Sequence, residues 1–251
     1  MAGNTLGMAI QSDSAPLQVL LTRPEQESRA FATTLADRFG PRLRPVVSPL
    51  MRPETLTPTL PPGPFAGVIF TSPQGVASAA AFRAQLPDLA WCVGARTARE
   101  ARAAGFQARS ADGDAVALIA AIRADPPPGA LLHLQGKDTR GDVAGHLSRA
   151  GIPTARAVVY HQAPQPLTAE AAELLSRPGV VLVPLFSPRS ARLFLKALPT
   201  PTGADLRLAA ISPAAAEVLS PLGLQVAVAR RPDAEAMVEA VGSLIAAAPP
   251  P

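Results

Sequence analysis

The nine residues VIFTSPQGV, at positions 68–76, decide the fold. Three apolar residues predict a buried strand, and the turn Thr71-Ser72-Pro73 follows that strand directly. A serine oxygen can accept a backbone N–H of the first helical turn, and proline suits the first helical position, so this turn predicts a helix start. A buried strand that leads through such a turn into a helix is the repeating unit of an α/β protein.

The same strand–turn–helix unit recurs along the chain. Helices are predicted at 25–39, 75–85, 96–104, 115–123, 142–150, 168–175, 189–198, 214–219 and 233–247. Strands are predicted at 19–21, 67–70, 91–94, 106–109, 130–134, 155–160, 180–186, 208–211 and 224–229, with a proline-containing edge or linker strand at 44–51. Short apolar strands that alternate with helices predict parallel sheets covered on both faces. About ten strands exceed one flavodoxin-like unit, so we expect two doubly wound domains.

An internal repeat also favours two similar halves. Three strand–helix turns recur in the same order, with Ser72 matching Ser187, Gly94 matching Ser212 and Thr22 matching Gln135. The members of these pairs lie 115, 118 and 113 residues apart, so the offset is nearly constant. A constant offset is typical of repeated structural units.

The composition describes a folded protein with a mild positive charge. Of the 251 residues 48% are hydrophobic, which is enough for a core, and 23 Lys and Arg residues exceed 19 Asp and Glu residues. All but two of the cations are arginine, which suits carboxylate or phosphate recognition, although a GC-rich genome would give the same bias. The arginines are scattered and aromatic residues make up 4%, so nucleic-acid binding is not expected.

The sequence predicts a cytoplasmic protein without a membrane partner. No apolar run reaches the ~18 residues of a membrane span, and residues 1–16 lack the basic and apolar regions of a signal peptide. The one cysteine, Cys92, rules out a disulfide framework and fits a reducing compartment. We interpret Cys92 as a buried core residue.

Motifs for metal and cofactor binding are missing. Three histidines lack ligand spacing and are interpreted as packed or solvated side chains: His133, His146 and His161. Residues 136–139 are not a phosphate loop, because Leu131 stands where that motif has its first glycine and Asp138 replaces a serine or threonine. No dinucleotide-binding or nucleophile-elbow motif follows any predicted strand. We therefore expect no metal and no cofactor, and catalysis by positioning, charge complementarity and acid assistance.

Hydroxyl-bearing turns recur where strands lead into helices. They occur at Thr22, Thr71-Ser72, Ser187 and Ser212. Helix capping alone would explain each of them. In doubly wound sheets, however, such turns lie at the carboxyl ends of strands, where backbone N–H groups and the helix dipole bind anions. Several such turns together would suit a ligand with many negative groups.

Tyr160 is the only tyrosine, and it ends the predicted strand 155–160 near the expected crossing between the halves. A phenol is protonated at neutral pH and can donate a hydrogen bond. The sequence leaves two interpretations open, which are an aromatic side chain in a linker and a proton donor in a functional site.

Seven segments together resemble the uroporphyrinogen-III synthase family. They occur in the family's order over about residues 17–245. They are VLLTRPEQ (19–26), VIFTSPQGV (68–76), CVGARTAREARAAGF (92–106), LLHLQGKDTRGDVAGHLSRAGI (131–152), VVYHQ (158–162), PLFSPRSARLFL (184–195) and AAISPAAAEVL (209–219).

The resemblance implies two flavodoxin-like α/β domains joined by a two-stranded linker. Domain 1 would be discontinuous, comprising 17–42 and 166–246, and domain 2 would comprise 54–154. The linker strands would be 43–53 and 155–165, with flexible tails at 1–16 and 247–251.

The resemblance also implies an activity. Enzymes of this family are lyases that close hydroxymethylbilane, a linear tetrapyrrole rich in carboxylates, to uroporphyrinogen III. Ring D is inverted through a spiro intermediate, and no cofactor is used. A monomer that acts in the cytoplasm is expected. Tyr160 is the catalytic candidate, and the candidate substrate-binding residues are Thr22, Arg23, Thr71, Ser72, Gln74, Thr97, Ser187, Ser190 and Ser212.

The sequence departs from the family's pattern at two turns. Gln135 replaces a residue that is often basic, and Ala214 and Ala215 lack hydroxyls that many members carry. A different class of function stays open, which is a non-catalytic, two-lobed cytoplasmic binder of an anionic small molecule. A glycosyltransferase-like enzyme is a third class, for which the chain shows no nucleotide-sugar motif.

Overall fold

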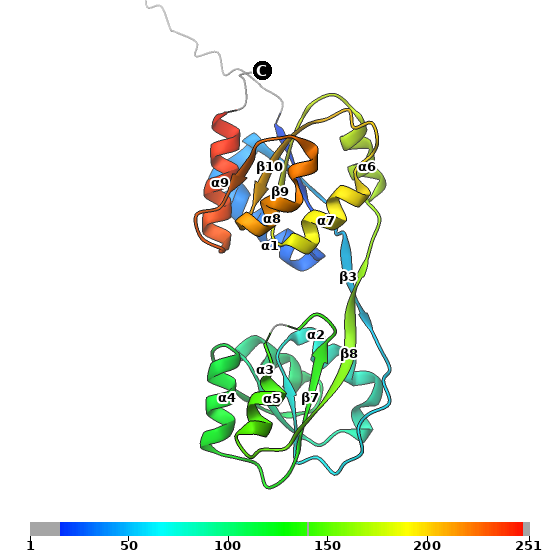
Figure 1. The fold of residues 1–251 in the computed structure, drawn as a ribbon, viewed down its shortest axis with the longest axis vertical. Coiled ribbons are helices and arrows are strands. Elements are labelled where there is room, and N and C mark those ends of the chain that lie inside the picture. Colours follow the sequence, from blue (N-terminus) through cyan, green and yellow to red (C-terminus); the bar gives the residue numbers. More distant parts are fainter. Residues whose placement is uncertain (1–15, 140, 248–251) are drawn as a thin grey trace, which may run out of the picture. The chain divides into compact units, whose positions relative to one another are not determined.

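The computed structural model describes residues 16–139 and 141–247. The chain divides into two compact units, which are Met1–Arg52 with Pro164–Pro251, called unit 1, and Pro53–Ala163, called unit 2. Each unit contains a sheet with parallel strands and helices on both faces (Figure 1). The predicted α/β class with two parallel-sheet units is thereby confirmed.

Unit 1, as far as it is described, contains a five-stranded sheet in the order β11-β10-β9-β1-β2, with every pair parallel. The strands are β1 (Leu17–Leu21), β2 (Leu43–Val47), β9 (Val180–Leu185), β10 (Asp205–Ala210) and β11 (Val226–Val228). The helices are α1 (Glu25–Phe39), α6 (Ala169–Ser176), α7 (Pro188–Ala197), α8 (Pro213–Val218) and α9 (Ala234–Ala246), with short 3₁₀ turns at Gly40–Arg42 and Ser220–Leu222. The first strand in sequence is thus an inner strand of the sheet.

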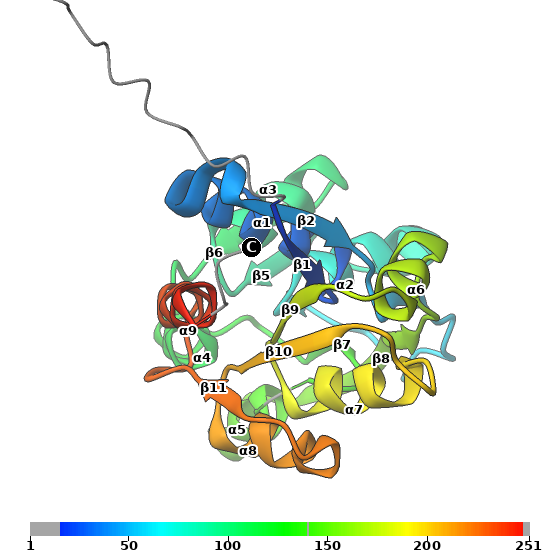
Figure 2. The ribbon, with the colours of Figure 1, turned by 90° about the horizontal axis from the view of Figure 1, so that it is seen from above.

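Helices cover both faces of the unit 1 sheet because its strands are apolar on both sides. Leu20 of β1 packs in a core with Phe194 of α7, whereas Leu21 packs with Phe31 of α1 and Met237 of α9. Successive side chains of a strand point to opposite faces, so β1 contributes to both cores. Figure 2 shows α7 and α8 on one side of β9 and β10, and α1 and α9 on the other.

Unit 2 is built around a sheet in the order β3-β8-β7-β4-β5-β6 among the described residues. The strands are β3 (Met51–Thr55), β4 (Gly67–Phe70), β5 (Leu89–Cys92), β6 (Gln107–Ser110), β7 (Leu131–Gly136) and β8 (Thr154–Pro164). The helices are α2 (Pro73–Ala79), α3 (Ala95–Ala103), α4 (Ala115–Ala124) and α5 (Val143–Arg149). One core lies against α2 and α3, and another lies against α4 and α5.

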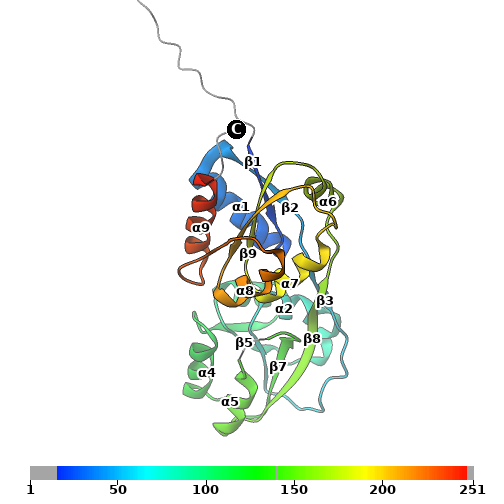
Figure 3. The same ribbon diagram turned by 45° about the horizontal axis from the view of Figure 1, so that its top comes forward.

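The connection between the units consists of β3 and the end of β8, which lie side by side (Figures 1 and 3). The Gln165 N–H donates to the Leu50 carbonyl at 2.9 Å, and the Leu56 N–H donates to the Val159 carbonyl at 2.8 Å. From the first bond to the second, the residue number rises from 50 to 56 on one segment and falls from 165 to 159 on the other, so the two segments are antiparallel.

The prediction that residues 43–53 form a linker strand is wrong for the first half of this range. Leu43–Val47 is β2, which pairs with β1 along its whole length and belongs to the sheet of unit 1. Pro45 is compatible with that position because β2 is an edge strand, where one side of the backbone needs no ladder partner. The second predicted linker strand, 155–165, also begins inside a sheet, since Thr154–Tyr160 of β8 pairs with β7.

The predicted helix 75–85 is shorter in the structure. It begins at Pro73, and α2 ends at Ala79 before a 3₁₀ segment, Ala80–Gln85, in which Phe82 leaves helical backbone angles. The Phe82 side chain is buried in the core against α2 and α3, so tertiary packing overrides the local helical pattern.

No helix within residues 16–139 and 141–247 is long and apolar enough to cross a membrane. The predicted tails, 1–16 and 247–251, lie outside the described residues except for Pro16 and Ala247.

Replacing Leu20 by alanine tests the inner position of β1. Leu20 is 0% exposed, so the cavity should lower the free energy of unfolding by about 2–5 kcal/mol. The control Leu224→Ala removes a side chain that is 41% exposed and should change it by no more than about 0.5 kcal/mol. Hydrogen exchange of the β9 and β10 amides under denaturant measures both values, and equal protection in the two variants would contradict the placement of β1.

Candidate functional site

The carboxyl ends of the strands in unit 2 carry the first group of predicted site residues. From β4 the chain proceeds to β5 and β6 on one side, whereas β7 and β8 lie on the other side of β4. The direction therefore reverses between β4 and β7, and ligands of doubly wound sheets bind beside such a reversal. Thr71 and Ser72 follow β4 at this point.

Ser72 and Tyr160, which are 88 residues apart in sequence, meet there. Ser72 is the N-cap of α2, and its Oγ accepts the Gly75 N–H at 3.2 Å. The same Oγ lies 2.9 Å from the Tyr160 hydroxyl oxygen. Both side chains are partly buried. The structure thus joins two predicted site residues, from α2 and β8, in one hydrogen bond.

Thr71 contacts His133, for which the sequence predicts a packed or solvated side chain. Its Oγ1 lies 3.3 Å from Nε2 of His133, which points from β7 into unit 2 and is 0% exposed. Burial, followed by the charge of Arg156, lowers the pKa of His133 to about 4, and the charge of Asp142 opposes this shift. His133 is therefore neutral at physiological pH, and its buried Nδ1 has no hydrogen-bond partner among the described residues.

The remaining predicted residues of unit 2 lie on neighbouring helices. Gln74 is on α2, and its Nε2 lies 3.5 Å from the Ser78 Oγ in the same helix. Thr97 is on α3, which follows β5, and it is 3% exposed. The N-cap of α3 is Gly94, which provides no capping side chain. Thr97 therefore follows β5, whereas Ser72 follows β4, which is the direct neighbour of β7 in the sheet.

In unit 1 the predicted serines cap helices at the carboxyl ends of β9 and β10. The Ser187 Oγ accepts the Ser190 N–H at 3.0 Å, and the Ser190 Oγ donates to the Ser187 carbonyl at 2.9 Å. The Ser212 Oγ accepts the Ala215 N–H at 3.4 Å. Capping is thus confirmed for Ser72, Ser187 and Ser212.

The turn after β1 differs from the prediction. Thr22 does not cap α1, because this helix begins at Glu25 and its N-cap is Pro24, which has no side-chain hydrogen bond. Pro24 thus lies one position before the first helical residue, whereas proline is favoured at that first helical position itself. The Thr22 Oγ1 is buried, and no residue in the described part of the chain forms a hydrogen bond with it.

Arg23 lies beside the corresponding reversal of unit 1, between β1 and β9. Its guanidinium carbon is 4.2 Å from the centre of the Phe186 ring, a cation–π contact with the residue that follows β9. Burial lowers the pKa of Arg23, and the charge of Glu27 opposes this shift. Arginine remains charged at any physiological pH, so this turn presents a partly desolvated cation.

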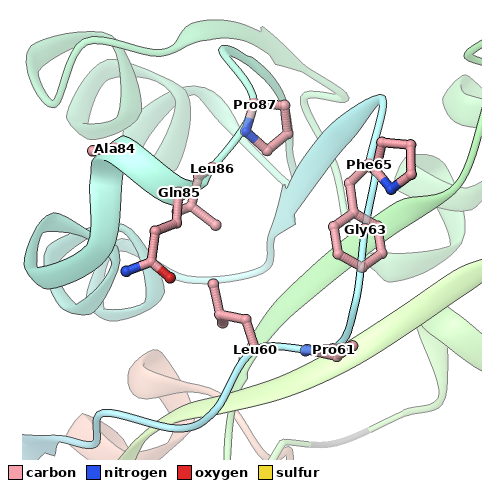
Figure 4. Close-up of a pocket in the computed structure, with 9 residues that line it drawn as sticks. Leu60, Pro61, Gly63, Phe65, Ala84, Gln85, Leu86 and Pro87 are labelled. Atoms are coloured by element: carbon pink, nitrogen blue, oxygen red, sulfur yellow. The ribbon is translucent and has the colours of Figure 1, made fainter.

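Two cavities, one in each unit, lie away from these residues. One, of about 430 Å³, lies between residues 60–65 and 84–87, which precede β4 and β5 (Figure 4). Another, of about 390 Å³, is lined by Gln18, Arg44 and Gly179 among others, at the amino ends of β1, β2 and β9. Both therefore lie at the amino ends of strands, opposite the predicted site residues.

The described residues contain no group of three or more His, Cys, Asp or Glu side chains that could hold a metal ion. Cys92 is buried, as expected, and burial raises the pKa of its thiol to about 11. A buried thiol with a raised pKa is not a reactive thiolate.

Comparisons with known proteins give one matching family model and several similar solved structures. The family model described as Uroporphyrinogen-III synthase HemD matches residues 17–239. The crystal structure of uroporphyrinogen-III synthetase from Helicobacter pylori 26695 is similar with a TM-score of 0.56 at 19% identity, over 91% of this chain and 99% of that chain, which shows the fold. A mutant uroporphyrinogen III synthase from the extremely thermophilic bacterium Thermus thermophilus gives a TM-score of 0.43 at 16% identity, over 92% of this chain and 100% of that chain. No curated protein matches the chain.

The buried, neutral His133 predicts a specific pH dependence of stability. Between about pH 6.5 and 4 the unfolded chain binds a proton on this imidazole that the folded chain does not bind. The free energy of unfolding should therefore decrease by about 1.4 kcal/mol per pH unit as the pH falls through this range. His133→Leu should remove this contribution, and His146→Gln, at an exposed histidine, should retain it. Urea unfolding followed by fluorescence of Trp91, in the same unit, measures the slopes, and identical slopes for wild type and His133→Leu would refute the assignment.

Proposed function

Because the chain belongs to the uroporphyrinogen-III synthase family, we propose that Tyr160 is the proton donor of its reaction and that its hydroxyl-bearing turns bind substrate carboxylates. The protein is a lyase of tetrapyrrole biosynthesis, and it closes hydroxymethylbilane to uroporphyrinogen III. The observation that carries the proposal is the 2.9 Å contact between the Tyr160 hydroxyl and Ser72 at the chain reversal of unit 2.

The hydrogen bonds around Ser72 are compatible with a donor role for Tyr160. The Ser72 Oγ already accepts the Gly75 N–H. A hydroxyl has one proton and two lone pairs, so Ser72 can donate its own proton to the Tyr160 oxygen. In that arrangement the phenol proton remains available to a substrate, whereas in the reverse arrangement Tyr160 donates to the second lone pair of Ser72.

The reaction needs one proton at its first step. The carbon–oxygen bond of the substrate hydroxymethyl group breaks, the Tyr160 proton goes to the departing oxygen, and water leaves. The electron pair of the adjacent pyrrole nitrogen stabilises the resulting cation. Ring D then attacks through its substituted carbon to give a spiro intermediate, which fragments and recloses to the inverted isomer. The step is redox-neutral, and the last carbon–carbon bond formation releases a proton that restores the phenol.

The substrate carboxylates require fixed positive or N–H partners. Arg23 offers a partly desolvated guanidinium, which prefers planar, bidentate partners such as carboxylates. Helix starts supply roughly 0.3–1 kcal/mol each toward an anion, so several are needed to hold one conformer. The proposed binding positions are Thr22, Arg23, Thr71, Ser72, Gln74, Thr97, Ser187, Ser190 and Ser212.

The proposal includes a monomer that acts in the cytoplasm. All the proposed positions come from one chain, so the reaction needs no residue of a second copy. The single cysteine is compatible with a reducing compartment. Size-exclusion chromatography with light scattering measures the first point, and a dimer at working concentration would contradict it.

The isomer of the product tests the activity. Hydroxymethylbilane generated in situ should give uroporphyrinogen III with the protein, resolved as uroporphyrin III after oxidation. Hydroxymethylbilane alone closes without inversion to isomer I. If the protein binds the tetrapyrrole but yields isomer I, it is a two-lobed binder and the enzymatic assignment fails.

Replacing Tyr160 by phenylalanine removes the proposed donor and keeps the ring. The value of kcat should fall by about 10²–10⁴-fold, which is the usual contribution of a general acid, while KM changes little. Ser176→Ala removes an exposed hydroxyl elsewhere and should leave both constants unchanged. A Tyr160→Phe variant with wild-type kcat would eliminate the donor role.

A further inference from the structure

The strand that carries Tyr160 is irregular immediately before it. Gln135 of β7 is opposite Val158 of β8, but Gly136 is opposite Tyr160, so Val159 is an extra residue. This is the arrangement of a β-bulge. The Val159 carbonyl accepts the Leu56 N–H on the other side of β8, so its backbone remains bonded.

The bulge changes the face on which Tyr160 lies. Ala157 and Val159 are buried in the core against α2 and α3, as alternation along a strand requires. In a regular strand Tyr160 would then point to the opposite face. Instead Tyr160 packs against the same core as Val159. Two consecutive side chains therefore share one face, and the second of them reaches Ser72 of α2.

Gly136 provides the space for the Tyr160 ring. A Cβ atom at Gly136 would lie 2.6 Å from Cζ, 2.7 Å from Cε2 and 2.8 Å from the hydroxyl oxygen of Tyr160. These distances are shorter than any normal contact. The φ angle of Gly136 is not positive, so its backbone conformation would accept any residue. Glycine is needed here because of the ring and not because of the backbone.

Tyr160 is held at three points around this glycine. Its carbonyl accepts the Lys137 N–H at 2.9 Å, its ring covers Gly136, and its hydroxyl contacts Ser72 at 2.9 Å. Moving the ring by the radius of a methyl group would break the contact with Ser72, because a hydrogen bond weakens strongly beyond about 3.2 Å.

We propose that Gly136 and the bulge at Val159 are positioning elements that set the Tyr160 hydroxyl on Ser72. This inference rests on the proposed function where it concerns the rate of reaction, whereas the position of the ring is independent of it. Gly136 does not touch the reacting atoms and acts through Tyr160. A displacement of about 1 Å in a catalytic group can cost about 10²-fold in rate.

The variant Gly136→Ala tests the inference, with a spectroscopic measurement beside the kinetics. Because Tyr160 is the only tyrosine, protein grown with 3-fluorotyrosine gives a single ¹⁹F resonance from this ring. Gly136→Ala should shift that resonance and lower kcat by about 10²-fold, with KM within about twofold of wild type.

The matched control is Gly67→Ala. Its added Cβ would overlap the Trp91 ring in the same sheet, so the variant carries a comparable steric conflict away from Tyr160. Its melting temperature should fall, while the ¹⁹F resonance and kcat per folded molecule stay as in wild type. If Gly67→Ala shifts the resonance as much as Gly136→Ala does, the effect is general and the inference is overturned.

A double variant covers the case in which Gly136→Ala does not fold. Gly136→Ala combined with Tyr160→Ala removes the ring, so the alanine at 136 should add no loss of melting temperature beyond that of Tyr160→Ala. A further loss of melting temperature in the double variant, or a double variant that does not fold although Tyr160→Ala does, would show that the ring is not what excludes a side chain at 136.

The outcomes separate the two proposals. A shifted resonance in Gly136→Ala, together with full activity of both Gly136→Ala and Tyr160→Phe, would retain the position of the ring and reject the donor role. A slow Tyr160→Phe together with a fast Gly136→Ala would reject the positioning role of Gly136. An unchanged resonance in Gly136→Ala would reject the geometry on which this inference rests.

Discussion

The pairing of β1 with β9 is the interaction on which unit 1 depends. Val19 lies beside Leu182, more than 160 residues later in the chain, and β2 completes the sheet on the other side of β1. Because the first strand belongs inside this sheet, the chain must leave unit 1, build unit 2 and return. The two crossings are β3 and β8, and the second of them carries Tyr160. Tyr160 therefore lies on one of the two segments that connect the units.

The elements that could be predicted from the sequence are those fixed by local chemistry. The apolar runs before Thr71 and Ser187 predict strands that are buried on both faces, and the sheets contain them. The Ser-Pro turns predict helix starts, and Ser72, Ser187 and Ser212 are caps. Each of these features depends on a few neighbouring residues, which is why a single sequence is sufficient for them.

The features that could not be predicted depend on pairing between distant segments. Residues 43–47 contain a proline, so their sequence fits a linker as well as an edge strand. They form an edge strand because they pair with β1. The bulge opposite Gly136 is a feature of the register in which β7 and β8 pair. The sequence of neither strand alone predicts that pairing. Tyr160 stood out because it is a unique residue, but its contact with Ser72 follows from that register. His133 was interpreted as packed or solvated, and it is the buried contact of Thr71.

The arginines show how a compositional bias and a local role can coexist. Several form exposed ion pairs, such as Arg29 with Glu25 and Arg109 with Asp125, which contribute little to stability. Arg23 differs, because it stacks on Phe186 and is partly desolvated. A GC-rich genome would account for arginines of the first kind, whereas Arg23 has the partly desolvated guanidinium on which the proposed carboxylate binding relies.

The buried thiol of Cys92 makes unit 2 observable by itself. With a pKa of about 11, roughly one thiol in 10⁴ is ionised at pH 7, and the sulfur is shielded from reagents. Alkylation of the native chain therefore has to wait for a transient opening of the β5 region. The rate of that labelling would follow the fluctuations of one half of the molecule with no engineered probe, since the other half contains no cysteine.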